Sequence, residues 1–477
     1  MNSPDPSNPS LALRIGLPLP NLLETRVGRL AVFFLLYVTE GIPLGFSATA
    51  VATQMRRQGI GPTEIGVFVG TLYLPWAWKW LVGPFVDIFY SEKLGRRRAW
   101  IVATQVLMSL GLLYSMTVDF STDLKFYTAI IVLVNIFGAT QDVAIDALAC
   151  TTLDASERGT ANGLMFSGAY LGQALGGSGV LFLSERIGFS SAGLLAIASV
   201  LSITLFVALP LRETYVKSEN SAPETDRLSE VGREVKTYVR QAVRSIFLTR
   251  NSLAAAAFAL LPCGAMSLSL ALASNLSVEL GLADSEIATL TLISSVISAA
   301  GCVIGGFLSD RFGRNRMLVL YVLAMAIPVA TMSYSMHVHG YVMPVDPTAP
   351  NRPPVATLLV TIFWITNIFF SASQGLMYGT RTALLMDVCD PEVAATQFTA
   401  YMSMMNLVIW YSSSWQGWAI ESLGYPKTLA LDAASGMLCL LLLPFIKPRD
   451  AGGTGPPSDS SHGSPRGEAQ YRNPRMS

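Results

Sequence analysis

Long apolar runs constrain the fold of this 477-residue chain more than any other feature. A helix needs about 20 consecutive apolar residues to cross the hydrocarbon core of a bilayer. Only 13% of the residues are charged, whereas soluble domains carry roughly 25%. The sequence therefore predicts an all-α membrane protein. Roughly twelve runs have the necessary length: 29–53, 63–86, 99–118, 124–149, 159–183, 190–210, 252–274, 286–308, 316–336, 355–386, 395–416 and 425–446.

The positive charges predict how these runs are oriented. Loops rich in Lys and Arg stay in the cytoplasm. If twelve runs cross the membrane, both chain ends lie on one side, which then holds 24 of the 32 Lys and Arg residues, against six on the other side. We therefore expect both termini to be cytoplasmic. Residues 1–25 lack a basic stretch followed by a short apolar core, so we expect no cleaved signal peptide.

A basic central segment, residues 211–251, divides the runs into two groups of six. We expect two pseudo-symmetric six-helix bundles, 29–210 and 252–447, with disordered tails at 1–28 and 448–477. The central segment is typical of an amphipathic helix lying on the inner leaflet. Its apolar face would carry Leu228, Val231, Val235, Val239, Ala242 and Ile246, and its basic face Arg233, Lys236, Arg240 and Arg244.

An internal repeat follows the second and eighth runs. GPFVD (83–87) precedes GRRR (95–98) in the first group, and GGFLSDRFGRNR (305–316) occupies the corresponding place in the second. The glycines allow helices to approach closely, and the acid and arginines can clamp the two halves in one state. The alternative is a basic turn that only sets topology. The candidate gating residues are Gly83, Asp87, Arg96, Arg97, Gly306, Asp310, Arg311, Gly313 and Arg314.

Four ionisable residues lie well inside the apolar runs of the first group: Glu40, Lys79, Asp142 and Asp146. Such a residue costs roughly 2.5–3.5 kcal/mol to insert and is a functional candidate by default. At about 1.5 Å per residue, all four lie in the middle or inner half of the bilayer. Asp142 and Asp146 are four residues apart and share a helix face. Because two such carboxylates repel each other, we expect one of them to hold a proton.

Two interpretations of these charges remain open. In the first, the acids take up and release a proton, or bind a cationic or hydrogen-bonding group, as a cavity changes its exposure. Lys79 lies at the depth of Asp146 and would be the partner that protonation switches. In the second, Asp146 and Lys79 form a static ion pair that orders the bundle.

Further polar and aromatic residues are candidates for the wall of a substrate cavity. The internal repeat places Arg381 opposite Ile145, where it would face the acids and suit an anionic group on the substrate; the alternative is that its side chain snorkels to the membrane surface. The other candidates are Gln141, Trp76 and Trp80. A glycine stripe in the fifth run predicts tight helix packing: Gly168, Gly172, Gly176 and Gly177.

The remaining features argue against an enzyme or a metal site. The five cysteines lie in or at the ends of apolar runs without a CxxC pair, which favours packing over disulfides or metal binding. His337 and His339 lie in a Pro-rich outer loop, and we expect no metal there. HExxH and GxSxG motifs and a phosphate-binding glycine loop are all missing. We therefore expect no cofactor and no catalytic residues, and a net charge of zero gives no indication of nucleic-acid binding.

The repeated motif GGFLSDRFGRNR closely resembles the cytoplasmic signature of the major facilitator superfamily. GIPLG (41–45), WKWLVGPFVD (78–87), GRRRAW (95–100) and QDVAIDA (141–147) resemble its peptide–acetyl-coenzyme A–drug branch, which includes AmpG-type muropeptide permeases. By this resemblance, four residues match recurring positions of the motifs: Lys79, Asp87, Asp142 and Asp146. Glu40 departs from the muropeptide permeases, which tend to have a small residue there.

The resemblance implies proton-driven import of a bulky anionic or amide-rich solute by alternating access, across the cytoplasmic membrane of a bacterium. A muropeptide is the preferred solute. GIPLG also resembles acetyl-coenzyme A transporters, and LPWAWK (74–79) resembles siderophore permeases, so both solutes remain alternatives. A transport-dead membrane sensor is the alternative of another class. The expected partners are a small solute, protons and the bilayer, and by analogy with facilitators the protein is a monomer.

Overall fold

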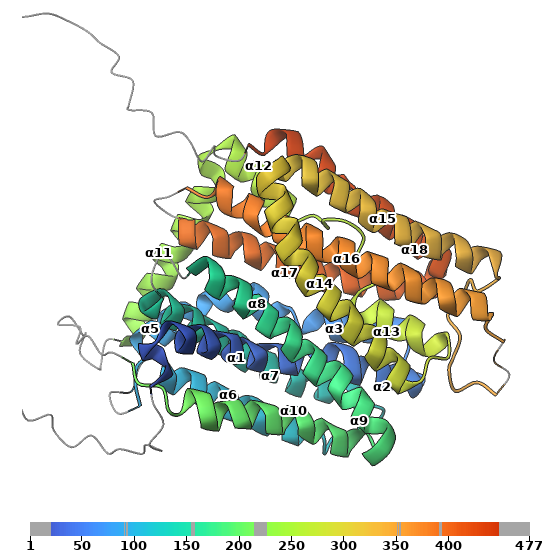
Figure 1. Ribbon diagram of the computed structural model, residues 1–477, viewed down its shortest axis with the longest axis horizontal. Helices are drawn as coiled ribbons and strands as arrows, with labels where there is room; N and C mark the ends of the chain where they lie inside the picture. The colour runs from blue at the N-terminus through green and yellow to red at the C-terminus, as the bar shows by residue number, and fades with distance from the viewer. Residues whose placement is uncertain are drawn as a thin grey trace, which may run out of the picture.

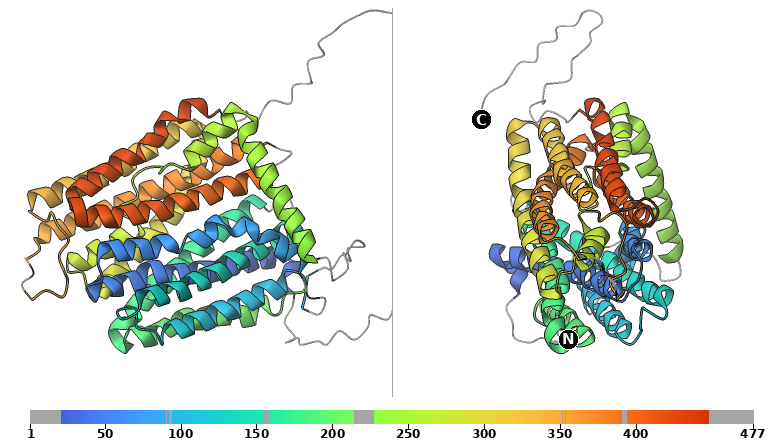
Figure 2. Two further views of the ribbon diagram at one scale, coloured as in Figure 1. Left: turned by 180° about the vertical axis from the view of Figure 1, so that it is seen from behind. Right: turned by 90° about the vertical axis from the view of Figure 1, so that its right-hand side faces the viewer.

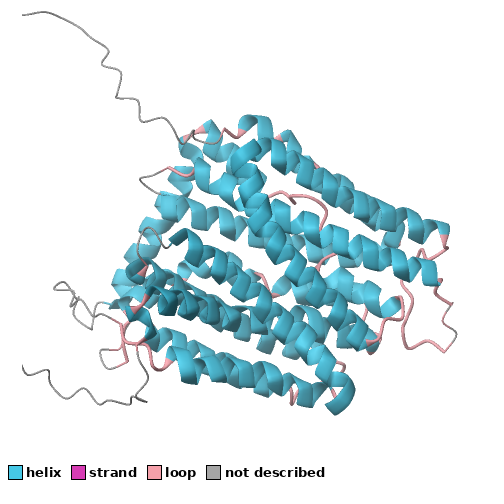
Figure 3. Ribbon diagram, viewed as in Figure 1, coloured by secondary structure: helices cyan, strands magenta, loops and turns pink. Residues whose placement is uncertain are grey.

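The computed structural model describes residues 21–447 apart from 90, 92, 93, 154–157, 214–226, 351, 353 and 391–393. Helices make up almost all of this part of the chain (Figure 3), and within it the one β-type contact is an isolated bridge between Ser91 and Gly95. The predicted all-α class is confirmed. The predicted C-terminal tail, 448–477, lies outside the described residues.

The first half of the chain forms a group of roughly parallel and antiparallel helices (Figure 1). Its second predicted run, 63–86, is interrupted near Pro75 and Lys79, where the chain leaves the helical path and returns. The helices are α1 (Arg26–Gly45), α2 (Ala52–Arg57), α3 (Pro62–Thr71), α4 (Leu74–Ala77), η3 (Lys79–Leu81), α5 (Gly83–Ile88), α6 (Arg98–Ser115), α7 (Leu124–Thr152), α8 (Arg158–Ala174), α9 (Val180–Ile187) and α10 (Phe189–Ile203).

The second half is built in the same way after the central helix. Its first predicted run, 252–274, is also interrupted, because residues 260–269 between two helices are not helical. The elements are α11 (Arg227–Leu248), α12 (Arg250–Ala259), α13 (Leu270–Glu279), α14 (Asp284–Phe312), α15 (Arg314–Val338), α16 (Thr357–Val388), α17 (Ala394–Leu423), α18 (Tyr425–Gly436), η7 (Leu438–Leu441) and η8 (Leu443–Phe445).

Seven continuous helical stretches in the described residues are long and apolar enough to cross a membrane. The two interrupted runs are not among them, because neither holds one long helix. The twelve predicted crossings and the cytoplasmic termini therefore stay predictions. The seven stretches are Arg26–Arg57, Leu124–Thr152, Phe189–Ala208, Asp284–Phe312, Arg314–Val338, Thr357–Val388 and Tyr425–Phe445.

Residues 21–28, which belong to the predicted N-terminal tail, form a turn and the start of α1. A short turn, η1 (Leu22–Glu24), precedes α1, and Leu23 is buried. The Asn21 amide donates to the Arg212 carbonyl at 3.1 Å. This contact fixes the start of the first half against the start of the central segment. Residues 1–20 lie outside the described part of the chain.

Glycines allow α1 and α8 to pack with their backbones in contact, as the stripe in the fifth run predicted. A Cβ on Gly172 would lie 2.2 Å from the Val38 carbonyl oxygen, and one on Gly176 would lie 2.1 Å from that of Ile42. On the facing helix, a Cβ on Gly41 would lie 2.0 Å from the Ala169 carbonyl oxygen. The packing interpretation of the stripe is confirmed.

The central helix α11 lies across one end of the two halves (Figure 2, left). The predicted helix is present. Val231 of its apolar face is buried and Ile246 packs against the core, whereas Val239 of the same face is 37% exposed. The predicted position on the inner leaflet stays a prediction. The end of the molecule that α11 covers is called the linker end below. The opposite end, where α2 and α13 lie (Figure 1), is called the far end.

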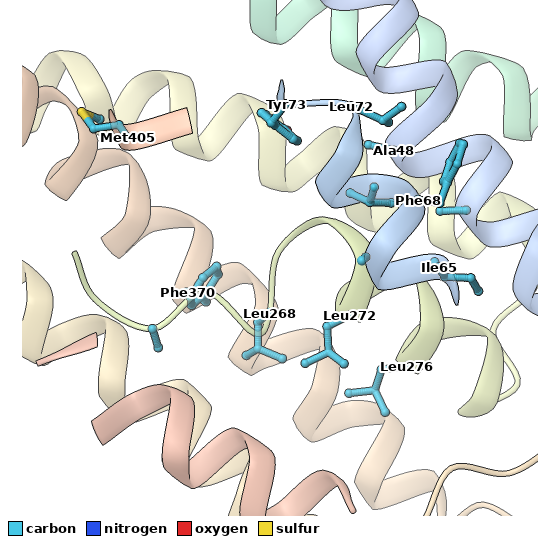
Figure 4. Packing of buried hydrophobic residues seen from close by; sticks show 14 of the residues in the cluster. Ala48, Ile65, Phe68, Leu72, Tyr73, Leu268, Leu272, Leu276, Phe370 and Met405 are labelled. Carbon is cyan, nitrogen blue, oxygen red and sulfur yellow. The ribbon is translucent and has the colours of Figure 1, made fainter. Parts of the chain in front are cut away.

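A continuous hydrophobic core joins the two halves near the far end. Ile65 and Phe68 of α3 belong to the same buried cluster as Leu272 and Leu276 of α13 (Figure 4). Helix α3 also packs closely on α17, where a Cβ on Gly66 would lie 2.4 Å from the Ser413 carbonyl oxygen. The interrupted runs therefore meet helices of the other half.

Candidate functional site

A cavity of about 1040 Å³ lies between the two halves. Ligand pockets usually have volumes of about 300–1,000 Å³, so this one is large enough for a bulky solute. Residues of α1, α7 and α8 line it from the first half, residues of α16 and α17 from the second, and residues of α11 from the linker end. The four predicted intramembrane charges, Glu40, Lys79, Asp142 and Asp146, all belong to its wall.

Lys79 forms its ion pair with Asp142 and not with Asp146. The Lys79 Nζ lies 2.5 Å from the Asp142 Oδ2, and the two side chains are 19% and 3% exposed. The predicted Asp146–Lys79 pair is therefore wrong. Lys79 opens η3, directly after the break at α4, so its direction does not follow the periodicity of one continuous helix. The pair ties this break to α7.

Asp146 has a neutral partner. The Tyr37 hydroxyl of α1 donates to the Asp146 Oδ1 at 2.6 Å. Glu40, one turn further along α1, has a buried Oε2 without a hydrogen-bond partner among the described residues. The first-half wall thus holds three carboxyl groups and one ammonium group, and only one of the carboxyls is in an ion pair with that ammonium. Such a cluster can hold an extra proton or receive a donor group of a ligand.

The aromatic candidates lie at the cavity as predicted, but Gln141 does not. Trp76 and Trp80 both line it, and the Lys79 Nζ lies 6.0 Å from the centre of the Trp76 ring. Gln141 is fully buried, and its Nε2 donates to the Thr39 hydroxyl at 2.8 Å, which links α7 to α1. The prediction that Gln141 forms part of the cavity wall is wrong, because its side chain turns into the helix interface.

Arg381 lies on the second-half wall of the cavity and is only 6% exposed, so its side chain does not snorkel. Its Nη2 donates to the carbonyls of Ala259 at 3.1 Å and Leu261 at 3.0 Å, where α12 ends. Its guanidinium also lies 5.5 Å from the centre of the Phe258 ring. Arg381 therefore lines the cavity and also donates hydrogen bonds to carbonyls that have no helical partner at the break.

A buried acid stabilises the other side of the same break. Asp432 of α18 is 1% exposed and accepts hydrogen bonds from the backbone N–H groups of Met266 at 2.7 Å and Ser267 at 2.9 Å. Non-helical backbone at membrane depth persists only where it is buried in protein or lines a cavity. The segment 260–269 meets this condition, because Arg381 and Asp432 satisfy its two ends. No local pattern in the segment indicated this pair of contacts.

The repeated glycine–acid–arginine motif forms contacts within the second half. Arg314 lies 3.1 Å from Asp310 and also pairs with Asp387 of α16, so it joins α14, α15 and α16. Gly313, with φ of 93°, makes the turn between α14 and α15. Arg311 places its guanidinium over the Phe312 ring at 5.7 Å.

The glycine of close approach in this motif is Gly305 and not the predicted Gly306. A Cβ on Gly305 would lie 2.3 Å from the Leu376 carbonyl oxygen, whereas one on Gly306 or on Gly83 would have no neighbour within 4 Å. The packing role assigned to Gly306 and Gly83 is therefore wrong. Gly83 instead lines the cavity.

In the first half, the arginines of the motif bind backbone and a linker acid. The Arg97 Nη1 donates to the Val86 carbonyl at 2.8 Å, and the Arg97 backbone N–H donates to Glu213 at 3.0 Å. Arg96 lies in the same turn with its Nε buried. The side chain of Asp87 lies outside the described residues. The clamp between halves that the motif predicted is thus not among the contacts described at this end.

Contacts that join the two halves are present at the far end, where the sequence analysis did not place them. Arg56 of α2 pairs with Glu279 of α13 at 2.6 Å, and these side chains are 3% and 0% exposed. The Tyr425 hydroxyl donates to the same Glu279 oxygen at 2.6 Å. Arg57 donates to Asp284 at 2.5 Å. The sequence did offer a signal for these contacts. Two adjacent arginines follow the first predicted run, and two acids follow the seventh.

Neither a metal site nor a disulfide is found among the described residues. Within the described part of the chain, no three His, Cys, Asp or Glu side chains gather closely enough to hold a metal ion. The five cysteines are free thiols, and Cys263, Cys389 and Cys439 are buried.

Comparison with known proteins gives the family. The family model described as "Major Facilitator Superfamily" matches residues 30–413 and 264–470. The anhydromuropeptide permease of Escherichia coli (strain K12) is 24% identical over 423 residues, covering 87% of this chain and 79% of that protein. A putative transporter named AmpG 4 from Rickettsia conorii is 23% identical and covers 88% of this chain and 96% of its own length.

Solved structures of transporters share the fold. The inward-open xylose transporter XylE from E. coli superposes with a TM-score of 0.65 at 12% identity, covering 90% of this chain and 98% of that one. A POT family transporter in complex with a thioalcohol-conjugated peptide gives 0.66 at 10% identity, with 87% and 95% covered. The family match spans most of the sequence, and a large cavity lies between the two halves. The chain therefore belongs to the Major Facilitator Superfamily and is a multi-pass membrane transporter of AmpG type rather than an enzyme.

Proposed function

We propose that this protein imports a bulky, amide-rich solute of the muropeptide class by proton-coupled alternating access. The observation that carries the proposal is the cluster of Glu40, Lys79, Asp142 and Asp146 in the wall of one large cavity between the halves. Intramembrane ionisable residues that line a cavity mark ion and substrate pathways. Asp146 accepts a hydrogen bond from the neutral Tyr37 hydroxyl, whereas the direct ion pair of Lys79 is with Asp142, so Asp146 is the preferred proton carrier.

Twelve crossings with cytoplasmic termini fit the same proposal. The interrupted runs, 63–86 and 252–274, still pass from one end of the molecule to the other as chains of short helices. Discontinuous helices near the bilayer midplane are a common way to build transporter sites. The concentration of Lys and Arg at the linker end supports a cytoplasmic position of α11.

The far-end contacts support an arrangement that is closed at the far end. Two ion pairs, Arg56–Glu279 and Arg57–Asp284, hold the halves together at the end away from α11. The cavity instead reaches the linker end, where residues of α11 belong to its wall. Alternating access requires the far-end pairs to separate when the cavity opens outward.

The solute class rests on two supports. The matched relatives include an anhydromuropeptide permease and a transporter named AmpG, each over most of this chain. The cavity wall also offers aromatic faces, Trp76 and Trp80, beside carboxylates and two arginines. Sugar rings pack on aromatic faces, and peptide groups bind carboxylates and guanidinium groups. A muropeptide presents both chemistries.

The test is uptake of radiolabelled anhydro-muropeptide into right-side-out membrane vesicles containing the protein, with and without an imposed inward proton gradient. We expect accumulation that a protonophore abolishes. Vesicles without the protein serve as the control for passive leak. Binding without accumulation at any gradient would indicate a sensor and contradict the proposal. Uptake of a siderophore or a coenzyme A ester in place of the muropeptide would keep the transporter and replace the solute.

A further inference from the structure

The central helix contributes a stripe of side chains to the cavity, although it lies outside both groups of six predicted runs. Arg233, Thr237 and Gln241 line the cavity at helical spacings of four residues. Glu234 and Tyr238, also in the wall, form the adjacent row. Residues at these spacings share one face of a helix. One face of α11 thus lines the cavity. On another face, Val243 and Phe247 are 50% and 69% exposed.

Tyr238 connects the central helix to both halves at once. Its ring stacks on Trp80 of η3, with ring centres 5.4 Å apart and planes inclined by 11°. Its hydroxyl donates to the Thr396 carbonyl of α17 at 3.3 Å. Trp80 and Tyr238 both line the cavity. The ring stack and the hydrogen bond therefore link η3 of the first half to α17 of the second half at the linker end of the cavity.

The stack is attached to the charge cluster through the chain itself. Trp80 follows Lys79 in η3, a single turn of three residues. Lys79 is held by Asp142 at 2.5 Å. A movement of this turn that separates the ion pair must therefore also move the ring that Tyr238 covers.

We propose that α11 is a wall of the solute site and that the Trp80–Tyr238 stack is its cytoplasmic gate, which opens when η3 moves. The polar groups of Arg233, Thr237 and Gln241 then meet the solute as it leaves. This inference rests on the proposed transport function for its direction. It requires no particular solute, because it concerns access to the cavity and not recognition.

Thiol labelling tests the gate without a solute. The five native cysteines are replaced by Ala, and Ala169, a partly buried residue of the cavity wall, is replaced by Cys. Inside-out vesicles are treated with a membrane-impermeant maleimide. We expect Tyr238→Ala and Trp80→Ala each to raise the labelling rate roughly two- to tenfold, the range that loss of one aromatic pair gives. The double variant should label no faster than the faster single variant, because both remove the same stack.

Two further variants separate a gate from general loosening. Val243→Ala, on the exposed face of α11, should leave the labelling rate unchanged. Tyr238→Phe keeps the ring and loses the bond to Thr396, so its rate should lie between those of the parent and Tyr238→Ala. Unchanged labelling in both Tyr238→Ala and Trp80→Ala would overturn the proposal, whatever solute the protein carries. An equal increase in Val243→Ala would also overturn it.

A cross-link provides the converse test. In a variant with Cys at both 80 and 238 and no other cysteine, a short bifunctional thiol reagent that a reductant can cleave should hold the gate closed. We expect proton-driven uptake to stop after cross-linking and to recover after reduction. Uptake that continues unchanged in fully cross-linked protein would show that this path is not the gate. If the variant shows no uptake before treatment with any of the tested solutes, the labelling experiment alone decides.

Discussion

Lys79 Nζ lies 2.5 Å from the Asp142 Oδ2, while Asp146, one helical turn away on the same face of α7, receives the Tyr37 hydroxyl at 2.6 Å. The two acids therefore have different partners, one cationic and one neutral. A carboxyl paired with an ammonium group is held in its charged form, whereas one that faces a hydroxyl can take up a proton without breaking an ion pair. Under the proposed function, this difference favours Asp146 over Asp142 as the proton carrier.

Removal of Lys79 should destabilise the protein through Asp142. Lys79→Ala leaves a buried carboxylate without its cation, which costs about 3 kcal/mol, at the low end of the range for a broken buried pair because Lys79 is partly exposed. A second change, Asp142→Asn, should restore most of the lost stability because it removes the unpaired charge. The melting temperature of the purified protein in detergent measures both effects. Equal rescue by Asp146→Asn would contradict the assignment of the pair.

Neutralisation of Asp146 should abolish gradient-driven uptake without unfolding the protein. Asp146→Asn keeps the size of the side chain and an oxygen that accepts from Tyr37, so we expect the amount of protein in the membrane to be unchanged. Uptake into energised vesicles should fall to the level of passive leak. Tyr37→Phe is the matched control, because it removes the hydrogen bond and leaves the carboxyl, and it should retain measurable uptake. Normal transport by Asp146→Asn would exclude this residue as the proton carrier.

Separation of the far-end ion pair should favour the outward-open state at a cost in stability. Glu279→Gln leaves Arg56 buried without an anion, and breaking a buried pair in this way typically costs about 3–5 kcal/mol. Hydrogen exchange should accelerate in α2 and α13, where the two residues lie. Lys125→Gln removes an exposed charge at the start of α7 and should change neither exchange nor melting temperature. Unaltered exchange in both helices of the Glu279 variant would show that the pair does not hold this end closed.

A single methyl group at the α1–α8 contact should prevent normal folding. A Cβ on Gly172 would lie 2.2 Å from a backbone oxygen of α1, and forced overpacking typically costs about 1–3 kcal/mol. A Cβ on Gly163, in the same helix, would have no neighbour within 4 Å, so Gly163→Ala should be neutral or slightly stabilising through its helix propensity. The yield of monodisperse protein in detergent compares Gly172→Ala with Gly163→Ala. Similar yields would mean that the helices can separate without penalty.

Local features of the sequence were sufficient to predict the membrane class, the helical segments, the central helix and the set of intramembrane charges. These predictions follow from apolar runs of sufficient length, a periodicity of 3.6 residues, and the cost of placing charge in lipid. The glycine stripe of α8 was likewise predictable, because four small residues on one face have little use other than close packing. The wall of one cavity contains all four of these charged residues: Glu40, Lys79, Asp142 and Asp146.

The pairing of these groups, in contrast, became visible only in the assembled fold. Lys79 follows the break after α4. Helical periodicity does not predict which way a side chain points beyond such a break. The spacing of residues therefore could not show that Lys79 pairs with Asp142 and not with Asp146. The inward turn of Gln141, the capping of segment 260–269 by Arg381 and Asp432, and the Arg56–Glu279 pair each join residues more than 100 positions apart. Such contacts depend on how whole helices pack against each other, and no local stretch of sequence contains that information.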